Sequence, residues 1–213
     1  ITSVALLVLS IIGIYQIEIT GSRIEDLPKN TDFYEDILFY EEDFNGILPI
    51  EILVDTGKEN EALSQATLSR VERLSEEIGE NPELSNPLSI GNLLKYAKQA
   101  YYKGLRKYYQ LPTRQERNFI LDAANNALSN EGDLTRSMVD SENRRLRLSL
   151  MMKDVKTSRM EEIEKDLNKS IEKIFPKERY DVALTGKALL YLKGTRYLVN
   201  NLVLSLLLAV ILI

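Results

Sequence analysis

Apolar residues dominate both ends of the chain, and charged residues are confined to the part between them. Residues 1–17 and 197–213 contain no Asp, Glu, Lys or Arg, and every charge lies between 18 and 196. A membrane helix needs about 20 consecutive apolar residues to cross about 30 Å of hydrocarbon. Each run is slightly shorter than that. We therefore expect both to be truncated transmembrane helices, with the intervening segment on one side of the membrane.

A signal peptide and a soluble core helix account less well for these runs. A signal peptide would have a basic segment before its apolar run and a small-residue cleavage site, and residues 1–17 show neither. The core helix of a soluble protein normally carries a polar stripe, whereas 202–213 contain one Ser and no stripe. Tyr15 and Tyr197 lie where the apolar runs meet polar sequence, a position typical of the membrane interface. Membrane insertion is therefore the favoured interpretation.

Between the apolar ends, the hydrophobic period changes several times and predicts a mixture of strands and helices. Alternating or β-branched runs predict strands at 48–55, 146–153 and 180–186, with a weaker extended stretch at 86–90. Apolar residues at helical spacing predict helices at 32–44, from about 63 to 79, in two segments of 91–130 separated at Pro112, near 133–140, and at 158–174.

Capping residues mark where several of these helices begin. Asn30 or Thr31 can cap the first helix, and Thr113 the helix that follows Pro112. Ser158 and Glu161 have the spacing of a capping box, in which the Ser accepts from a helical amide and the Glu reaches back. These signals predict where the helices start along the chain.

The order of elements predicts an α+β fold. Without a helical insertion at about 91–140, the order is βαββαβ, the ferredoxin-like split unit. Each helix has one apolar stripe and is expected to pack on one face of an antiparallel sheet. The predicted parts are 1–17 (end of a transmembrane helix), 18–47 (lead-in loop and helix), 48–186 (α+β domain) and 187–213 (helix entering the next span).

Composition restricts the chemistry of this domain. The chain contains no Cys, which excludes disulfides and thiolate metal sites, and no His, which excludes Ser-His-Asp catalysis and His-based zinc sites. Acidic and basic residues are mixed and the net charge is −5, which argues against nucleic-acid binding. Because no catalytic group of residues is recognisable either, we expect a protein that is not an enzyme and has no cofactor or metal.

Two charged stretches are candidates for a functional role. The acids at 41–43 point in different directions around a helix, so a solvated face is favoured over an oxygen-ligand metal site. Residues 95–109 interleave Lys and Arg with Tyr. The favoured interpretation is an amphipathic helix whose Tyr rings pack on neighbouring helices while its cations stay in water. Contact with a membrane or lipid is the second, and nucleic-acid binding the third.

Several short motifs follow one another along the whole chain. They are the segment IEIT at 17–20, DLP at 26–28, Phe39, the pattern F-x-G-x-x-P at 44–49 leading into the strand PIEI, PLSIGNLL at 87–94, and the stretch from LTG at 184–186 to SLLLA at 205–209. In order and spacing they resemble the porter-type loop domain of the resistance-nodulation-division (RND) transporter superfamily. More narrowly, they are similar to MMPL-like and Patched-like bacterial exporters.

The resemblance implies a proton-driven exporter of lipids or other hydrophobic compounds in the cell (inner) membrane, with 18–196 on the extracytoplasmic or periplasmic side. Its implied partners are membrane lipid or a hydrophobic small molecule, the remainder of the same transporter chain, and further copies in an oligomer. The family's proton relay lies in a later membrane helix. The alternative function is a membrane-anchored ligand-binding sensor or scaffold domain. Further apolar spans with an acidic pair would support the transporter, and a cytoplasmic signalling domain would exclude it.

Overall fold

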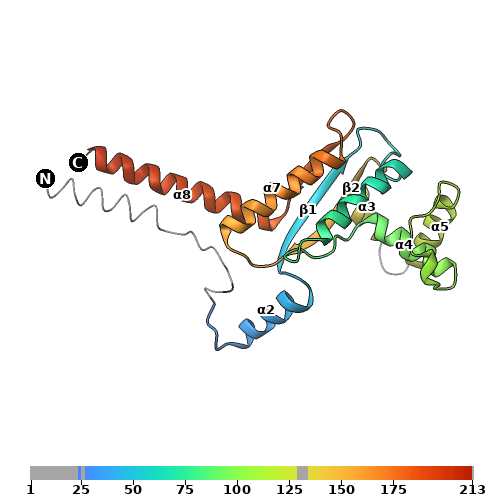
Figure 1. The fold of residues 1–213 in the computed structure, drawn as a ribbon, viewed down its shortest axis with the longest axis horizontal. Helices are drawn as coiled ribbons and strands as arrows, with labels where there is room; N and C mark the ends of the chain where they lie inside the picture. The colour runs from blue at the N-terminus through green and yellow to red at the C-terminus, as the bar shows by residue number, and fades with distance from the viewer. Residues whose placement is uncertain (1–23, 25–26, 129–133, 213) are drawn as a thin grey trace.

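A computed structural model describes residues 24, 27–128 and 134–212, which form a mixed α+β protein (Figure 1). The apolar run at 1–17 lies outside these residues. The described elements are the helices α2 (Asp32–Asp43), α3 (Gln65–Gly79), α4 (Ile90–Tyr101), α5 (Arg117–Leu128), α6 (Leu134–Met138), α7 (Thr157–Ile174) and α8 (Lys187–Leu212), the 3-10 helix η1 (Arg106–Tyr108), and the strands β1 (Leu48–Asp55), β2 (Arg145–Met152) and β3 (Asp181–Thr185).

The three strands form one antiparallel sheet with β1 in the centre, in the order β2-β1-β3. Ile52 of β1 lies opposite Leu148 of β2 and Leu184 of β3. The bounds of β1 are those predicted, and β2 and β3 each begin one residue away from the predicted strands. The strongly alternating and β-branched runs were therefore reliable predictors of strands.

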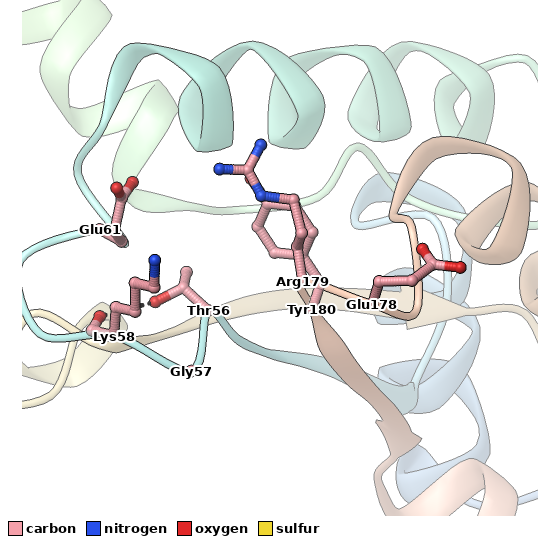
Figure 2. A pocket seen from close by; sticks show the side chains of 7 residues that line it. All are labelled: Thr56, Gly57, Lys58, Glu61, Glu178, Arg179 and Tyr180. Carbon is pink, nitrogen blue, oxygen red and sulfur yellow. Dashed lines mark hydrogen bonds between the residues drawn. The ribbon is translucent and has the colours of Figure 1, made fainter.

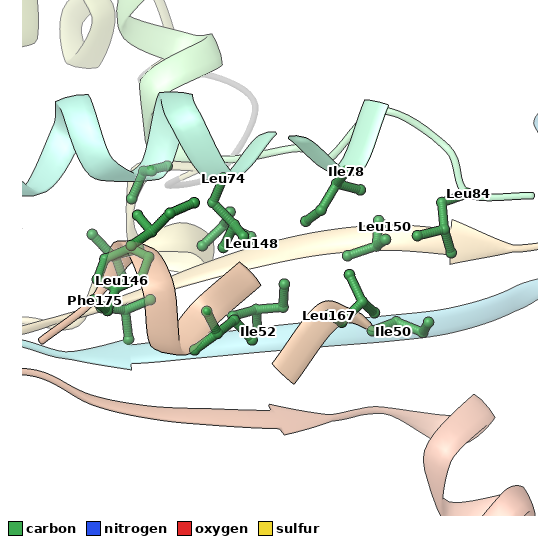
Figure 3. Packing of buried hydrophobic residues seen from close by; sticks show 14 of the residues in the cluster. Ile50, Ile52, Leu74, Ile78, Leu84, Leu146, Leu148, Leu150, Leu167 and Phe175 are labelled. Carbon is green, nitrogen blue, oxygen red and sulfur yellow. The ribbon is translucent and has the colours of Figure 1, made fainter. Parts of the chain in front are cut away.

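The core lies on one face of this sheet. Along β1, Ile50, Ile52 and Val54 are buried, whereas Leu53 points to the opposite face and is exposed. Helices α3 and α7 cover the buried face, as predicted from their apolar stripes (Figure 3). The buried stripe residues are Leu68, Val71, Leu74 and Ile78 in α3 and Met160, Ile163, Leu167, Ile171 and Ile174 in α7. Because burying one such side chain contributes about 1.5–3 kcal/mol, this layer is the main source of stability.

The extended stretch predicted at 86–90 does not become a strand. Within the described residues its pairing with β2 is limited to one isolated bridge, Leu88 with Ser149, and Leu84, just before the stretch, forms another with Met152. Two features stop it from lengthening. Pro87 has no amide to donate to a ladder. The amide and hydroxyl of Ser89 both donate to Asn92 Oδ1, at 3.1 and 2.7 Å, and thereby start α4.

The helix predicted from residue 91 ends earlier than expected. It stops at Tyr101 instead of continuing to Pro112, because Lys103 and Gly104 take positive φ values of 61° and 76° and reverse the chain into η1. Glycine adopts this conformation without steric cost. The predicted cap Thr113 does not start α5, which begins four residues later at Arg117. It closes the turn before that helix: its hydroxyl accepts from the Glu116 amide at 3.4 Å, and the Glu116 carboxylate accepts from the Thr113 amide at 2.9 Å.

The capping box predicted at Ser158 is wrong. The N-cap of α7 is Lys156, two residues before Ser158, and the helix begins at Thr157. With the helix starting there, the Thr157 side chain points into the protein and is buried. The predicted box partner Glu161 instead pairs with Arg196 of α8 at 3.0 Å. Tertiary packing and a distant cation thus override the local signal.

The elements are spread along one long axis (Figure 1). Helix α8 projects from one end of the domain, whereas α4 and α5 lie at the opposite end, where α4 contacts α3 and β2. Helix α2 stands apart from the core: none of its twelve residues, all of which are described, is buried. It begins as predicted, because the Thr31 hydroxyl accepts from the Tyr34 amide at 3.3 Å.

Candidate functional site

Helix α8 is the most unusual element of the structure. Its first turns pack on the core, with Ala188, Leu189 and Leu192 buried. Every residue from 200 to 212 is exposed, and most of them are Leu, Val or Ile. Among the described residues α8 is the one helix whose length and composition allow it to cross a membrane, and none of its most apolar stretch is buried in the protein. Tyr197, three residues before this stretch, is itself exposed.

A single glycine joins α8 to the sheet. Gly186 follows β3 directly and has a φ of +114°, a conformation that side chains disfavour. A Cβ atom at this position would lie 2.6 Å from the Pro49 carbonyl oxygen and 2.9 Å from Ile50 Cα. The backbone of β1 therefore closes tightly over the junction. This contact leaves little freedom for α8 to change direction without moving β3.

Ion pairs hold the next turns of α8 against α7. Lys193 Nζ lies 3.7 Å from Glu164 Oε1, and Arg196 Nη2 lies 3.0 Å from Glu161 Oε1. Each pair is partly exposed and contributes at most about 1 kcal/mol. Their main effect is to fix the direction of α8, because they hold the helix about one turn before its exposed apolar part begins. The membrane-length helix is thus attached both to the sheet and to α7.

At the other end of the molecule, residues 90–124 form what we call the distal tip, which comprises α4, η1 and the first turns of α5. A buried ion pair joins its helices: Lys98 Nζ donates to Glu116 Oε2 at 2.8 Å. The Tyr102 hydroxyl donates to the other oxygen of Glu116 at 3.1 Å. Lys98 is almost fully buried, so this carboxylate compensates a cation that has left water.

The environment of Glu116 favours its charged form. The hydrogen bond from Lys98 and that from the Thr113 amide lower the pKa of Glu116 to about 2, against a smaller opposing effect of burial. The hydrogen bond between Tyr102 and Glu116 raises the pKa of Tyr102, because its phenol donates to a carboxylate. The distal tip therefore contains a stable ion pair rather than a group that exchanges protons near neutral pH.

The surface of the distal tip carries the stretch at 95–109 that the sequence singled out. The Tyr96 and Tyr109 rings meet edge to face at 4.9 Å, and Lys95 Nζ lies 5.0 Å from the Tyr109 ring centre. Tyr102 and Tyr108 stack at 4.2 Å. The prediction that Tyr rings pack on a neighbouring helix is confirmed for Tyr101, whose ring lies 5.3 Å from that of Phe119 in α5. The prediction that the cations stay in water is wrong for Lys98, which is buried. Yet Tyr96 and Tyr101 remain more than half exposed, which an ordinary packed helix does not require.

A small polar pocket of about 280 Å³ lies where β1 ends and β3 begins (Figure 2). Lys58 and Glu61 line one side of it, and Arg179, Tyr180 and Glu178 line the other. Because both signs of charge are present in equal number, the pocket has no clear preference for an anion or a cation. It holds no arrangement of nucleophile and base.

Asp55, immediately before this pocket, is held firmly. It accepts from Arg144 Nε at 2.9 Å, from Arg145 Nε at 2.8 Å and from the Gly57 amide at 2.7 Å. These contacts, that with Arg144 first, keep the pKa of Asp55 well below its usual range. The carboxylate ties the end of β1 to the start of β2, so its role is structural.

The three acids at 41–43 do not share one environment. Glu42 and Asp43 are exposed, but Glu41 is half-buried and its Oε1 accepts from the Asp154 amide at 2.7 Å. Burial raises the pKa of Glu41, although that hydrogen bond opposes the effect. The prediction of a solvated face is therefore wrong for Glu41, which attaches α2 to the segment after β2. Within the described residues, no group of three or more acidic side chains is placed to hold a metal ion.

The chain matches no family model, and none of the curated proteins matches it. The residues that position the two ends of the molecule were largely missed from sequence. A signal for Glu116 was present, since Thr113 and Glu116 have capping-box spacing. Gly186 carried the weaker signal of a glycine between a strand and a helix. No sequence signal connected Lys98 with Glu116 or Arg196 with Glu161.

Proposed function

We propose that this chain is the extracytoplasmic domain of a proton-driven RND-type exporter of lipids or other hydrophobic compounds. The observation that carries the proposal is the passage from β3 through the single residue Gly186 into α8. A folded α+β domain is thereby built directly onto an exposed helix of membrane length. In the proposed protein, the domain lies on the outer side of the inner membrane and moves with the membrane helices that use the proton gradient.

The sheet supports a ferredoxin-like split βαββαβ unit within this proposal. In such a unit the first strand is central and antiparallel to the third and fourth, and β1 has this relation to β2 and β3. The segment before α4 runs along the outer edge of β2, where Leu88 and Ser149 exchange backbone hydrogen bonds of 2.7 and 2.9 Å. We place the second strand there, shortened to isolated bridges, and treat α4 to α6 as the helical insertion.

The proposed role of the domain is mechanical. A tilt or shift of α8 acts on β3 through Gly186 and on α7 through Arg196 and Lys193. Since β3 and α7 belong to the same core, the domain moves as one body instead of deforming. Such movement can open or close a path for a hydrophobic compound without any chemical step by the domain itself.

Export by bacterial cells that produce the full-length protein tests this proposal. Cells are loaded with Nile red, and its accumulation is followed with and without a protonophore. We expect less accumulation than in cells without the protein, and loss of that difference when the protonophore is added. R196E should weaken the effect, E161R/R196E should restore it, and K177E, which alters an exposed pair on the far end of α7, should leave it unchanged.

If Nile red and a panel of lipid-like dyes accumulate equally in cells with and without the protein, the proposal that the protein is an exporter is wrong. If efflux persists when the protonophore is present, export is not driven by the proton gradient. The alternative, a membrane-anchored ligand-binding sensor or scaffold, is favoured by the pocket at the end of β1, which is large enough for a small polar ligand. It predicts no efflux at all and an R196E variant that still binds its ligand normally.

A further inference from the structure

The distal tip has the opposite charge to the chain as a whole. Residues 90–124 contain seven Lys or Arg against two acids, Glu116 and Asp122, whereas the chain carries a net charge of −5. Glu116 is already occupied by the buried Lys98. The distal tip therefore keeps an excess of positive charge. Its exposed cations are Lys103, Arg106, Lys107 and Arg114.

Large apolar side chains lie among these cations. The exposed ones are Tyr96, Tyr101, Leu105, Tyr109 and Phe119, with between 38% and 60% of each residue in solvent. Tyrosine and arginine are among the residues enriched in protein interfaces and at their energetically dominant positions. Part of the surface is also ordered in advance. Lys95 is fixed by Glu72 at 3.1 Å and lies over the Tyr109 ring, so binding would cost little ordering of these two side chains.

Two grooves meet at Tyr96. The first lies between α4 and α5, has a volume of about 350 Å³ and an almost entirely apolar lining of Leu93, Tyr96, Ala97, Ala100, Tyr101, Ala123 and Ala124. The second, of about 450 Å³, is lined by Tyr96, Gln99, Arg106 and Tyr109. The apolar groove follows α4 from Leu93 to Tyr101, a length of about 12 Å at about 1.5 Å per residue. Two turns of a partner helix fit that length.

The position of the distal tip indicates whether its partner is another protein or the membrane that α8 would enter. The distal tip lies at the end of the molecule opposite to α8 (Figure 1). If α8 enters a bilayer, the tip points away from it and cannot reach its surface. An apolar groove beside a cationic one suits an amphipathic helix that carries acids along one edge, the helix-in-groove mode of recognition. Charge complementarity would also steer the encounter.

We infer that the distal tip is the docking surface for an acidic amphipathic helix of a partner protein. The apolar side chains of that helix lie between α4 and α5, and its carboxylates meet Arg106 and the neighbouring cations. This inference does not depend on the exporter proposal, because a sensor or a scaffold could use the same surface. The chain itself contains a helix of suitable chemistry: α2 has six acids, no Lys or Arg, and exposed Phe33, Phe39 and Tyr40.

A synthetic peptide with the sequence of residues 32–44 is therefore a suitable probe. The full chain is placed in phosphatidylcholine nanodiscs, and binding of the labelled peptide is followed by fluorescence anisotropy. A second peptide has Lys at all six acidic positions. We expect the acidic peptide to bind with an affinity that falls as salt is added, and the Lys peptide not to bind. R106E, which reverses the charge, and A100W, which fills the apolar groove, should each weaken binding at least about tenfold.

Control variants and a second probe make the result decisive. K177E reverses an exposed cation on another element and should change binding less than about twofold, and circular dichroism should show that all variants keep their helices. Equal binding of the acidic and the Lys peptide, or binding unaffected by both R106E and A100W, would overturn the inference. So would the absence of peptide binding together with Arg106-dependent binding of phosphatidylglycerol vesicles, which would identify the surface as one for anionic lipid.

Discussion

Lys98 Nζ lies 2.8 Å from Glu116 Oε2, and this contact joins α4 to α5 in the distal tip. Lys98 is only 3% exposed, so its cation would be left without compensation if the carboxylate were removed. It also lies 3.4 Å from the Leu111 carbonyl oxygen, which is a weaker partner. The geometry of the apolar groove therefore depends on one ion pair between residues eighteen positions apart.

Replacing Glu116 by alanine should destabilise the protein by about 3 kcal/mol. Breaking a buried pair from one side costs about 3–5 kcal/mol, and the partial exposure of Glu116 places this case at the lower end. Urea unfolding measures the effect. A matched control is E172A, whose partner Lys177 is largely exposed and whose loss should cost less than about 1 kcal/mol. K98M/E116Q removes the stranded charge and should recover about half of the loss; no recovery would show that Lys98 is not the reason for the cost.

Stability should fall in acid, and Glu116 should account for part of the fall. Its pKa is lowered from 4.5 to about 2 in the folded protein. A lowered pKa means that the contribution is fully present above pH 4.5 and is lost as the pH falls from about 4.5 towards 2. The free energy of unfolding of the wild type, measured in urea between pH 7 and pH 3, should therefore fall more steeply than that of E116Q. Parallel curves for the two proteins would contradict the assignment.

Gly186 and Gly194 should respond in opposite ways to substitution by alanine. G186A places a Cβ against the Pro49 carbonyl oxygen at a positive φ, and we expect a loss of at least about 1–3 kcal/mol from the backbone conformation alone. Gly194 lies inside α8 with open space around its Cβ position, so G194A should gain up to about 1 kcal/mol of helix propensity. Thermal unfolding of the two variants distinguishes a strained junction from a general sensitivity of α8.

A charge in the exposed apolar part of α8 should release the protein from membranes. Arginine at the centre of a membrane helix costs about 2.5–3.5 kcal/mol on insertion scales. In a protein reduced to residues 18–213, where 197–213 is the one long uncharged run, L206R should therefore increase the fraction extracted by carbonate. L190R is the matched control, because Leu190 is also exposed on α8 but lies in the turns beside the domain. Equal extraction of the wild type and L206R would mean that α8 is not inserted.

The sequence predicted those parts of the fold that local pattern determines. The alternating run at 146–153 and the β-branched run at 48–55 became β2 and β1 because each buries one side of a strand, and a shift of one residue would expose that side. The stretch at 86–90 could not be predicted in the same way. Its extended geometry depends on β2 as a neighbour. Locally, Pro87 has no amide for a strand hydrogen bond, and Ser89 hydrogen-bonds to Asn92 at the start of α4.

The candidate sites were less predictable, since they depend on contacts between distant residues. The interleaved Lys and Tyr residues at 95–109 indicated an unusual surface, but the groove beside them exists only because α5 folds back on α4. Among three consecutive acids, nothing local marks Glu41 as the one that accepts from the Asp154 amide, 113 residues away. The local pattern therefore predicted the strands, the helices and one unusual surface, but not the contacts that hold the surface in place.

Because α8 is one unbroken helix, the direction in which its outer side chains point depends on how its first turns pack. A helix turns by about 100° per residue, so the turns that bury Ala188, Leu189 and Leu192 determine the direction of every later side chain around the helix axis. If α8 enters a membrane, the side that meets lipid or a neighbouring helix is therefore fixed by the side that packs on β1. Adding one residue after Gly194 would rotate the outer half of the helix by about 100°, whereas adding seven would leave it within about 20° of its original phase.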